Sequence, residues 1–304
     1  MKQFCAKHKM KLLIFLAVWS FFSGCKVLLT FFGKPDGMDG KYPLFFLTIS
    51  LVALYVFPMI LIIRYIAKRF DISKKVIHLS WILGITASFY FSGLGQTLLG
   101  AFWLFIVKPP QTFIQNWGAA VTAPFHEEFG KGLVVLLVLL LLKKLTLKNA
   151  VVSGMIVGLS FQIIEDGLYV FQQIFKSKAD GFATLIERML HAGGTHWAFS
   201  LAFAVGLVAL VSKNSGMSKK QGLFWMLMAV LAHFFLNTPF NEGLTSNSGE
   251  ITVLMLCFSF CVALAAFFKV DQIEMNQHHQ QHILKQACID RLLLCYKPSI
   301  RNGC

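Results

Sequence analysis

Charged residues are scarce in this chain of 304 residues. Asp, Glu, Lys and Arg make up only 14% of it, against 56% hydrophobic residues and a mean hydropathy of +0.66. Soluble domains carry about 25% charged residues, so this composition excludes a soluble domain of this length. Because helices satisfy their own backbone hydrogen bonds in lipid, we expect an all-α polytopic protein of the cell membrane.

A disulfide framework is also absent. Of the seven cysteines, Cys25, Cys257 and Cys261 lie in apolar runs, and the others lie in polar segments near the two ends of the chain. Cys25 follows Phe22-Ser23-Gly24, which is similar to a lipoprotein cleavage site. We favour an ordinary signal-anchor helix, because the position three before the cysteine is Phe rather than Leu.

Acidic residues are few, and 14 of them against 28 Lys and Arg give a net charge of +14. Such a charge occurs in nucleic-acid-binding proteins, but no basic stretch here is interleaved with aromatic residues. We therefore expect no nucleic-acid partner. The basic excess instead indicates membrane topology and attraction to anionic lipid headgroups.

Long apolar runs dominate the chain. A membrane-spanning helix needs about 20 mostly apolar residues, and this criterion predicts eight spans: Leu12–Phe32, Pro43–Ile66, Val76–Val107, Ala119–Leu142, Ala150–Phe175, Leu185–Val211, Gln221–Phe240 and Ile251–Val270. The third run is overlong, so we expect either a tilted helix or a break near Gly93-Leu94-Gly95. Pro109-Pro110 ends it, since proline lacks the N–H that continues a helix.

Lysine and arginine fall on alternate loops. With a cytoplasmic N-terminus, the predicted inner segments hold most of these residues, at positions 2–11, 64–75, 143–148 and 213–220, and the outer loops hold five. This asymmetry predicts that both termini are cytoplasmic. We divide the chain into N-terminal helices (1–118), a four-helix core (119–240), a last transmembrane helix (241–270) and a cytoplasmic tail (271–304) with a short amphipathic piece near its end.

The fourth span carries ionisable groups into lipid. Glu127 and Glu128 lie four and three residues before Lys131, so the ammonium reaches either carboxylate along one helix face. Carboxylates near a helix N-terminus, neutralised by a lysine, would be a structural explanation. One lysine for two adjacent carboxylates leaves the second unexplained. Because ionisable groups in the membrane are costly, we treat the cluster as a candidate functional site.

Three further spans carry polar residues. Glu165 lies in the fifth span, beyond Gly154 and Gly158, whose four-residue spacing lets another helix approach closely. The sixth span holds His191 and His196, and the seventh holds His233 and Asn237, four residues apart. Each of these has a structural alternative, such as an interhelical hydrogen bond or, for Asn237, a helix cap.

The depth of these residues distinguishes a site from independent polar groups. At ~1.5 Å per residue, the two glutamates of span four, Glu165, His196 and His233 all lie roughly 10–16 Å below the outer surface, although the helices alternate in direction. We therefore expect four helices to present acids, imidazoles and an amide at one level.

Two kinds of hydrolytic chemistry fit this set. A carboxylate base with a neighbouring imidazole and amide can activate water and stabilise an oxyanion. Alternatively, Glu165, His196 and His233 supply ligands for Zn²⁺ with an open fourth position, and Glu127 or Glu128 is the base. Serine or cysteine nucleophiles fit less well, because only Ser200 lies near a matching depth.

The ordered motifs resemble those of the PrsW family of intramembrane proteases, which are related to the CAAX prenyl proteases and Abi proteins. The motifs are Glu127-Glu128-xx-Lys131, Phe161-xxx-Glu165, His196 with the following Trp-Ala-Phe-Ser, and His233-xxx-Asn237. The resemblance implies catalytic roles for Glu127, Glu128, Glu165, His196 and His233, with Asn237 and Lys131 in support. It leaves both a glutamic and a zinc-dependent mechanism open.

Two features depart from the family pattern. Asp166 follows Glu165 where many relatives carry Asn, which adds a negative charge. His191 precedes His196 by five residues, and the residues that follow His196 favour it as the site histidine.

We interpret the chain as an intramembrane peptidase that cleaves a membrane-anchored protein or peptide near the outer membrane boundary. The alternative from another class is a proton- or cation-coupled transporter that uses the same glutamates and histidines. Paired broken helices in two related halves, typical of transporters, are not evident in the sequence. A non-catalytic scaffold for other membrane proteins is a third interpretation.

Overall fold

The computed structural model describes residues 2–33, 41–177, 180–192, 194–244, 246–247 and 249–295. Within these residues the secondary structure is helical, as predicted. The helices are α1 (Lys2–Phe31), α2 (Tyr42–Ser50), α3 (Ala53–Arg69), α4 (Lys74–Ile85), α5 (Ala87–Ala101), α6 (Gln111–Leu141), α7 (Leu147–Phe171), α8 (Gly181–Ala192), α9 (His196–Val211), α10 (Lys219–Leu236) and α11 (Gly249–Cys295), with π-helical turns η1 (Phe102–Val107) and η2 (Gln172–Ser177).

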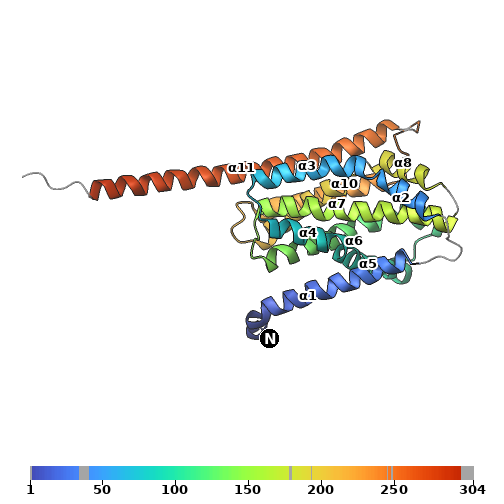
Figure 1. Ribbon diagram of the computed structural model, residues 1–304, viewed down its shortest axis with the longest axis horizontal. Helices are drawn as coiled ribbons and strands as arrows, with labels where there is room; N and C mark the ends of the chain where they lie inside the picture. Colours follow the sequence, from blue (N-terminus) through green and yellow to red (C-terminus); the bar gives the residue numbers. More distant parts are fainter. Residues whose placement is uncertain are drawn as a thin grey trace, which may run out of the picture.

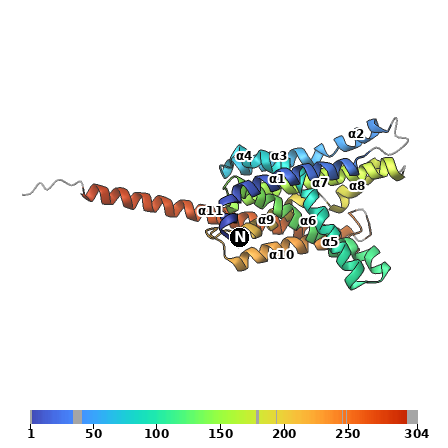
Figure 2. The same ribbon diagram turned by 90° about the horizontal axis from the view of Figure 1, so that it is seen from below.

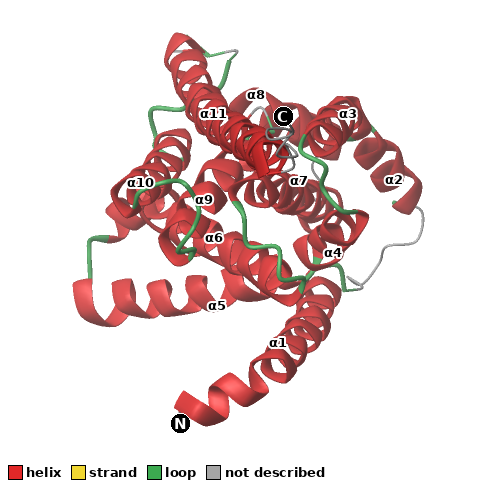
Figure 3. Cartoon of the chain, turned by 90° about the vertical axis from the view of Figure 1, so that its left-hand side faces the viewer, coloured by secondary structure: helices red, strands yellow, loops and turns green. Residues whose placement is uncertain are grey.

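Helix α7 lies in the middle of the bundle. Seen end-on, it is surrounded by α3, α4, α6, α9 and α11 (Figure 3), and it packs against each of them. Most of its side chains are buried, because small and aliphatic residues occupy every face of its first four turns. This central position allows the outer half of α7 to meet side chains from several neighbouring helices.

Among the residues that the structure describes, four helices are long and apolar enough to cross a membrane, and the number rises to six if each bent helix pair is one span. The bent pairs are α2 with α3, at 42°, and α8 with α9, at 46°. The chain is therefore a multi-pass membrane protein. Helix α6 stands outside this set, because three ionisable side chains interrupt its apolar half.

The overlong third run breaks at a different point from the one expected. Helix α4 ends at Ile85 and α5 begins at Ala87, so the break lies at Thr86 rather than near Gly93-Leu94-Gly95. Gly95, the second glycine of that segment, has a packing role instead, because an added Cβ would come within 2.8 Å of the His126 Cβ. The predicted stop at Pro109-Pro110 is confirmed, since η1 ends at Val107 and α6 starts after Pro110.

Helix α11 continues far past the apolar segment that predicted it. It runs without interruption to Cys295 and extends beyond the rest of the bundle in both side views (Figures 1 and 2). The residues after Val270 that we expected to form a tail are therefore helical as far as Cys295. No Gly or Pro occurs in residues 250–297, so nothing in the backbone ends the helix at the limit of the apolar run.

The basic connections gather at one end of the bundle. The α3–α4, α6–α7 and α9–α10 connections lie at the same end as the start of α1 (Figure 1). These connections and the helix ends beside them carry Lys74, Lys143, Lys144 and Lys213 among other basic residues. The α10–α11 connection and the junction of α8 with α9 lie at the opposite end, toward which the predicted site residues are placed.

Candidate active site

Helix α6 brings three ionisable side chains into the protein interior. Glu127, Glu128 and Lys131 are 6%, 0% and 0% exposed. The Lys131 Nζ lies 2.6 Å from Glu128 Oε1 and 3.6 Å from Glu127 Oε2, as their spacing on one helix predicted. Glu128 also accepts a hydrogen bond from the Ser200 hydroxyl at 3.1 Å. Glu128 is thus fully engaged, whereas Glu127 is not.

Two glycines on α7 position the first histidine. A Cβ on Gly154 would lie 2.6 Å from the Ser200 carbonyl oxygen, and one on Gly158 would overlap the His196 carbonyl oxygen. The predicted close approach is therefore confirmed, and the approaching helix is α9. It places His196, the first residue of α9, against the outer half of α7.

His196 is held from both sides of its ring. Nδ1 lies 2.9 Å from Lys131 Nζ, and Nε2 lies 3.1 Å from Glu165 Oε2. An ammonium can only donate and a carboxylate can only accept, so these partners assign the proton to Nε2 and the lone pair to Nδ1. The Nδ1 lone pair lies on the side of Glu127, whose Oε2 is 3.6 Å away.

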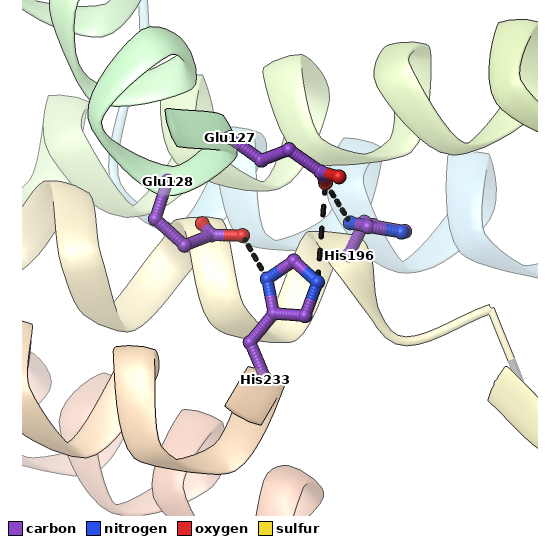
Figure 4. Close-up of side chains that lie close together, drawn as sticks. All are labelled: Glu127, Glu128, His196 and His233. Carbon is purple, nitrogen blue, oxygen red and sulfur yellow. Dashed lines mark hydrogen bonds and ion pairs between the residues drawn. The ribbon is translucent and has the colours of Figure 1, made fainter. Parts of the chain in front are cut away.

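His233 on α10 has the same kind of arrangement. Its Nδ1 lies 3.0 Å from Glu128 Oε1, and its ring stacks on Phe199 at 4.7 Å. Because the carboxylate accepts, Nδ1 carries the proton and Nε2 keeps its lone pair. Nε2 lies 3.9 Å from Glu127 Oε2. Figure 4 shows both imidazoles turned toward the same carboxylate.

Glu127 Oε2 is buried and has no hydrogen-bond partner. Two further acceptor atoms face it, His233 Nε2 and His196 Nδ1 (Figure 4), the second of which also accepts the Lys131 hydrogen bond. Buried acceptors normally have a donor, because leaving one unpaired costs about 1–3 kcal/mol. Such convergence is what a cation requires.

The donor set also fits a metal in distance and charge. Glu127, Glu128, His196 and His233 each offer one atom, and these four atoms lie within 4.8 Å of one another. Ligands about 2.0–2.1 Å from a tetrahedral metal lie roughly 3.4 Å apart, close to the 3.6 and 3.9 Å observed. Three buried carboxylates (Glu127, Glu128, Asp166) and the half-buried Glu165 face two cations (Lys131, Arg188), an imbalance that a divalent ion would neutralise. This group could therefore hold a metal.

Glu165 lies outside this compact group. Its Oε2 accepts hydrogen bonds from His196 Nε2 and from Arg188 Nη2, at 3.1 and 2.6 Å. The zinc ligands expected from the sequence were Glu165, His196 and His233, whereas the structure brings Glu127 and Glu128 together with the two histidines. Arg188 was missed, although an arginine inside a predicted span is the same signal that identified Glu127 and Lys131.

A cavity leads to the histidines from the end of the bundle opposite the basic connections. The cavity has a volume of about 420 Å³ and is lined by His196, His233, Asn237 and His191, among others. His191 lies toward the wall, with Nδ1 2.8 Å from the Glu187 carbonyl oxygen. The structure thus brings His196, and not His191, to the cluster. Asn237 caps α10 and also lines the cavity.

These features define a class: a multi-pass helical membrane protein with a buried glutamate and histidine centre that could hold a metal. The sequence matches the PrsW family of intramembrane metalloproteases over residues 73–265. The chain belongs to this family of peptidases, as the motifs indicated. The match extends beyond the predicted 119–240 core on both sides. Comparisons with the curated proteins and with the solved structures give no match.

Proposed function

We propose that this protein is an intramembrane peptidase that cleaves a membrane-anchored protein or peptide, with Glu127 as the carboxylate at the reacting centre. The observation that carries the proposal is the convergence of Glu127 Oε2 with the two inward lone pairs of His196 and His233 beside a cavity. The free carboxylate oxygen and the two imidazole nitrogens together form a ligand set for a metal ion that activates water.

We further propose eight membrane crossings with both termini in the cytoplasm. The gathering of the basic connections at one end of the bundle supports this orientation (Figure 1). The broken pairs α2 with α3, α4 with α5, and α8 with α9 then each count as one crossing. The site cavity would open toward the extracytoplasmic side, so cleavage would occur near that boundary of the substrate's membrane segment.

Zinc is the metal we propose, with His196, His233 and Glu127 holding it. A bound zinc ion would make water a nucleophile at neutral pH and polarise the carbonyl of the peptide bond. In this assignment Glu127 takes the place that the sequence reasoning gave to Glu165. Lys131 would give up its hydrogen bond to His196 Nδ1 and keep its ion pair with Glu128.

The remaining residues support the centre. Glu165 and Glu128 each accept the N–H of one imidazole and so fix which nitrogen faces Glu127. Carboxylates commonly orient metal-binding histidines in this way. Lys131 and Ser200 hold Glu128 in place. Asn237, at the cavity wall, is placed to donate a hydrogen bond to the substrate.

The test is cleavage of a labelled single-span substrate by the purified protein in liposomes, together with zinc content measured by mass spectrometry. Glu127→Gln is expected to lower the rate by about 100- to 10,000-fold and to lose the zinc, while it stays folded because Lys131 keeps Glu128. Glu165→Gln is expected to retain at least part of the zinc. Glu274→Gln, which changes a glutamate that pairs with Lys148 far from the site, is the matched control and should cleave as wild type.

Two results would overturn the proposal. One is cleavage by Glu127→Gln at the wild-type rate. The other is proton or cation flux through the liposomes that Glu127→Gln abolishes, with no cleavage by the wild type, which would favour the transporter. Zinc retained by Glu127→Gln but lost by Glu165→Gln would reject only the ligand assignment.

A further inference from the structure

Two adjacent carboxylates on α7 share one guanidinium. Arg188 on α8 donates from Nε to Asp166 Oδ1 at 2.5 Å and from Nη2 to Glu165 Oε2 at 2.6 Å. The same guanidinium lies over the Tyr169 ring, with its central carbon 3.9 Å from the ring centre. The Arg188 side chain is only 17% exposed. A planar fork with several donors can bridge two carboxylates in this way, whereas an ammonium acts as a point charge.

Asp166 is the anchor of this bridge. It is 2% exposed and accepts hydrogen bonds from Tyr55 Oη at 2.6 Å and from Gln162 Nε2 at 3.0 Å. Tyr55 comes from α3 and Gln162 from α7, so the contacts that hold Asp166, apart from Arg188, come from helices other than α8. The extra negative charge noted in the sequence at position 166 therefore has a structural function, because it holds Arg188.

Glu165 is the end of the same bridge that contacts His196. Its Oε2 receives both the Arg188 Nη2 and the His196 Nε2 hydrogen bonds. If Glu165 turned away, His196 Nε2 would lose its acceptor, and among the described contacts only Lys131 would still favour the lone pair on Nδ1. Arg188 does not touch Glu127 or His233 within the contacts of the described residues, so its effect on the centre passes through Glu165.

We propose that Arg188 is a positioning residue: anchored on Asp166, it fixes Glu165 against His196 and so keeps the His196 Nδ1 lone pair directed at Glu127. This inference rests on the proposed function for its kinetic consequence. It makes α8 part of the active centre, although α8 contributes no side chain to the compact group around Glu127.

The experiment compares Arg188→Lys with the double variant Asp166→Asn/Arg188→Lys. A lysine cannot bridge both carboxylates, so the single variant should lower kcat by about 10- to 100-fold with little change in KM. In the double variant the lysine has only Glu165 to neutralise, and part of the lost kcat should return. The double variant also relieves the unpaired charge if Arg188→Lys alone folds poorly.

Arg69→Lys is the matched control. Arg69 makes the same type of forked contact, from Nε and Nη2 to the carboxylate of Asp271, but at the basic end of the bundle. The same substitution there should leave kcat unchanged. Nitrogen NMR of ¹⁵N-histidine protein, with the His196 signals assigned from a His196→Gln variant, reports the tautomer independently of cleavage. Wild type should show protonated Nε2, and Arg188→Lys a mixture of tautomers.

The inference is overturned if Arg188→Lys keeps the wild-type kcat and His196 tautomer. It is also overturned if the double variant recovers no more activity than the single one, since the loss would then not reflect competition between the two carboxylates. Absence of cleavage by the wild type would reject the proposed function instead, and the tautomer of His196 would still decide the role of Arg188.

Discussion

Lys131 and Lys148 make the same type of ion pair in opposite surroundings. The Lys131 Nζ lies 2.6 Å from Glu128 Oε1, and both side chains are 0% exposed. The Lys148 Nζ lies 3.3 Å from Glu274 Oε2, and these side chains are 34% and 24% exposed. The exposed pair needs no special explanation, because ion pairs at a surface are common and contribute little.

The buried pair does need an explanation. Removing two charges from water costs free energy that burial of two hydrophobic side chains of similar volume would not. A buried ion pair such as Lys131 with Glu128 is therefore weak evidence for stability. What distinguishes this region is that two carboxylates share one ammonium: Glu127 Oε2 lies 3.6 Å from Lys131 Nζ and has no hydrogen-bond donor. The comparison teaches that charged side chains at the basic end of the bundle pair where they are partly exposed, whereas those at the other end pair inside the candidate active site.

Lys131→Met gives the largest expected effect and tests the comparison directly. The substitution removes the only ammonium in contact with Glu128 within the described residues and leaves two buried carboxylates uncompensated. Breaking a buried pair in this way costs about 3–5 kcal/mol. Thermal unfolding of the purified protein in detergent should show a large decrease in Tm.

The control for this prediction is Lys131→Met/Glu128→Gln. With the neighbouring charge removed, part of the lost Tm should return. A Tm of Lys131→Met equal to that of the wild type would mean that Lys131 does not compensate the glutamates, and the contrast with the basic end would fail.

Gly158→Ala has an intermediate expected effect and acts on the position of the site. The new Cβ would overlap the His196 carbonyl oxygen and lie 2.7 Å from the Trp197 Cα, and both belong to the α9 backbone. Overpacking of this kind costs about 1–3 kcal/mol. Because the displaced segment carries His196, cleavage should fall more than stability does, as measured by kcat and Tm on the same preparation.

Gly93→Ala is the matched substitution on α5, where an added Cβ meets nothing within 4 Å. Alanine is favoured over glycine in a helix interior by up to about 1 kcal/mol, so this variant should be as stable as the wild type or slightly more so. If Gly158→Ala behaved like Gly93→Ala, close approach of α7 and α9 would not be what positions His196.

The site was accessible to sequence reasoning because membrane depth is a strong constraint. Helices of opposite direction carried Glu127, Glu165, His196 and His233 to one calculated level, and the structure brings these side chains into contact. The family was recognisable for the same reason, since the motifs are the polar residues of successive apolar helices. All-helical secondary structure follows from composition alone.

Other features depend on packing that a sequence pattern does not contain. Glu127 and Glu128 are adjacent on one helix, and only the side chains that surround each of them differ. The sequence pattern therefore predicted the same role for both. The Arg188 bridge requires the bend between α8 and α9, which brings an arginine back over Glu165. We expected the break near two glycines instead of at Thr86, because glycine occurs both at helix breaks and at close contacts between helices.

Lys148→Gln gives the smallest expected effect and sharpens the comparison from its other side. The pair with Glu274 is partly exposed, so its loss should cost at most about 1 kcal/mol at low salt. Salt screens charges that water can reach, with a Debye length of about 10 Å at 0.1 M. The Tm difference between Lys148→Gln and wild type should therefore shrink as salt is raised, whereas that of Lys131→Met should persist. A salt-independent loss at Lys148 as large as that at Lys131 would show that the two ends of the bundle are not organised differently.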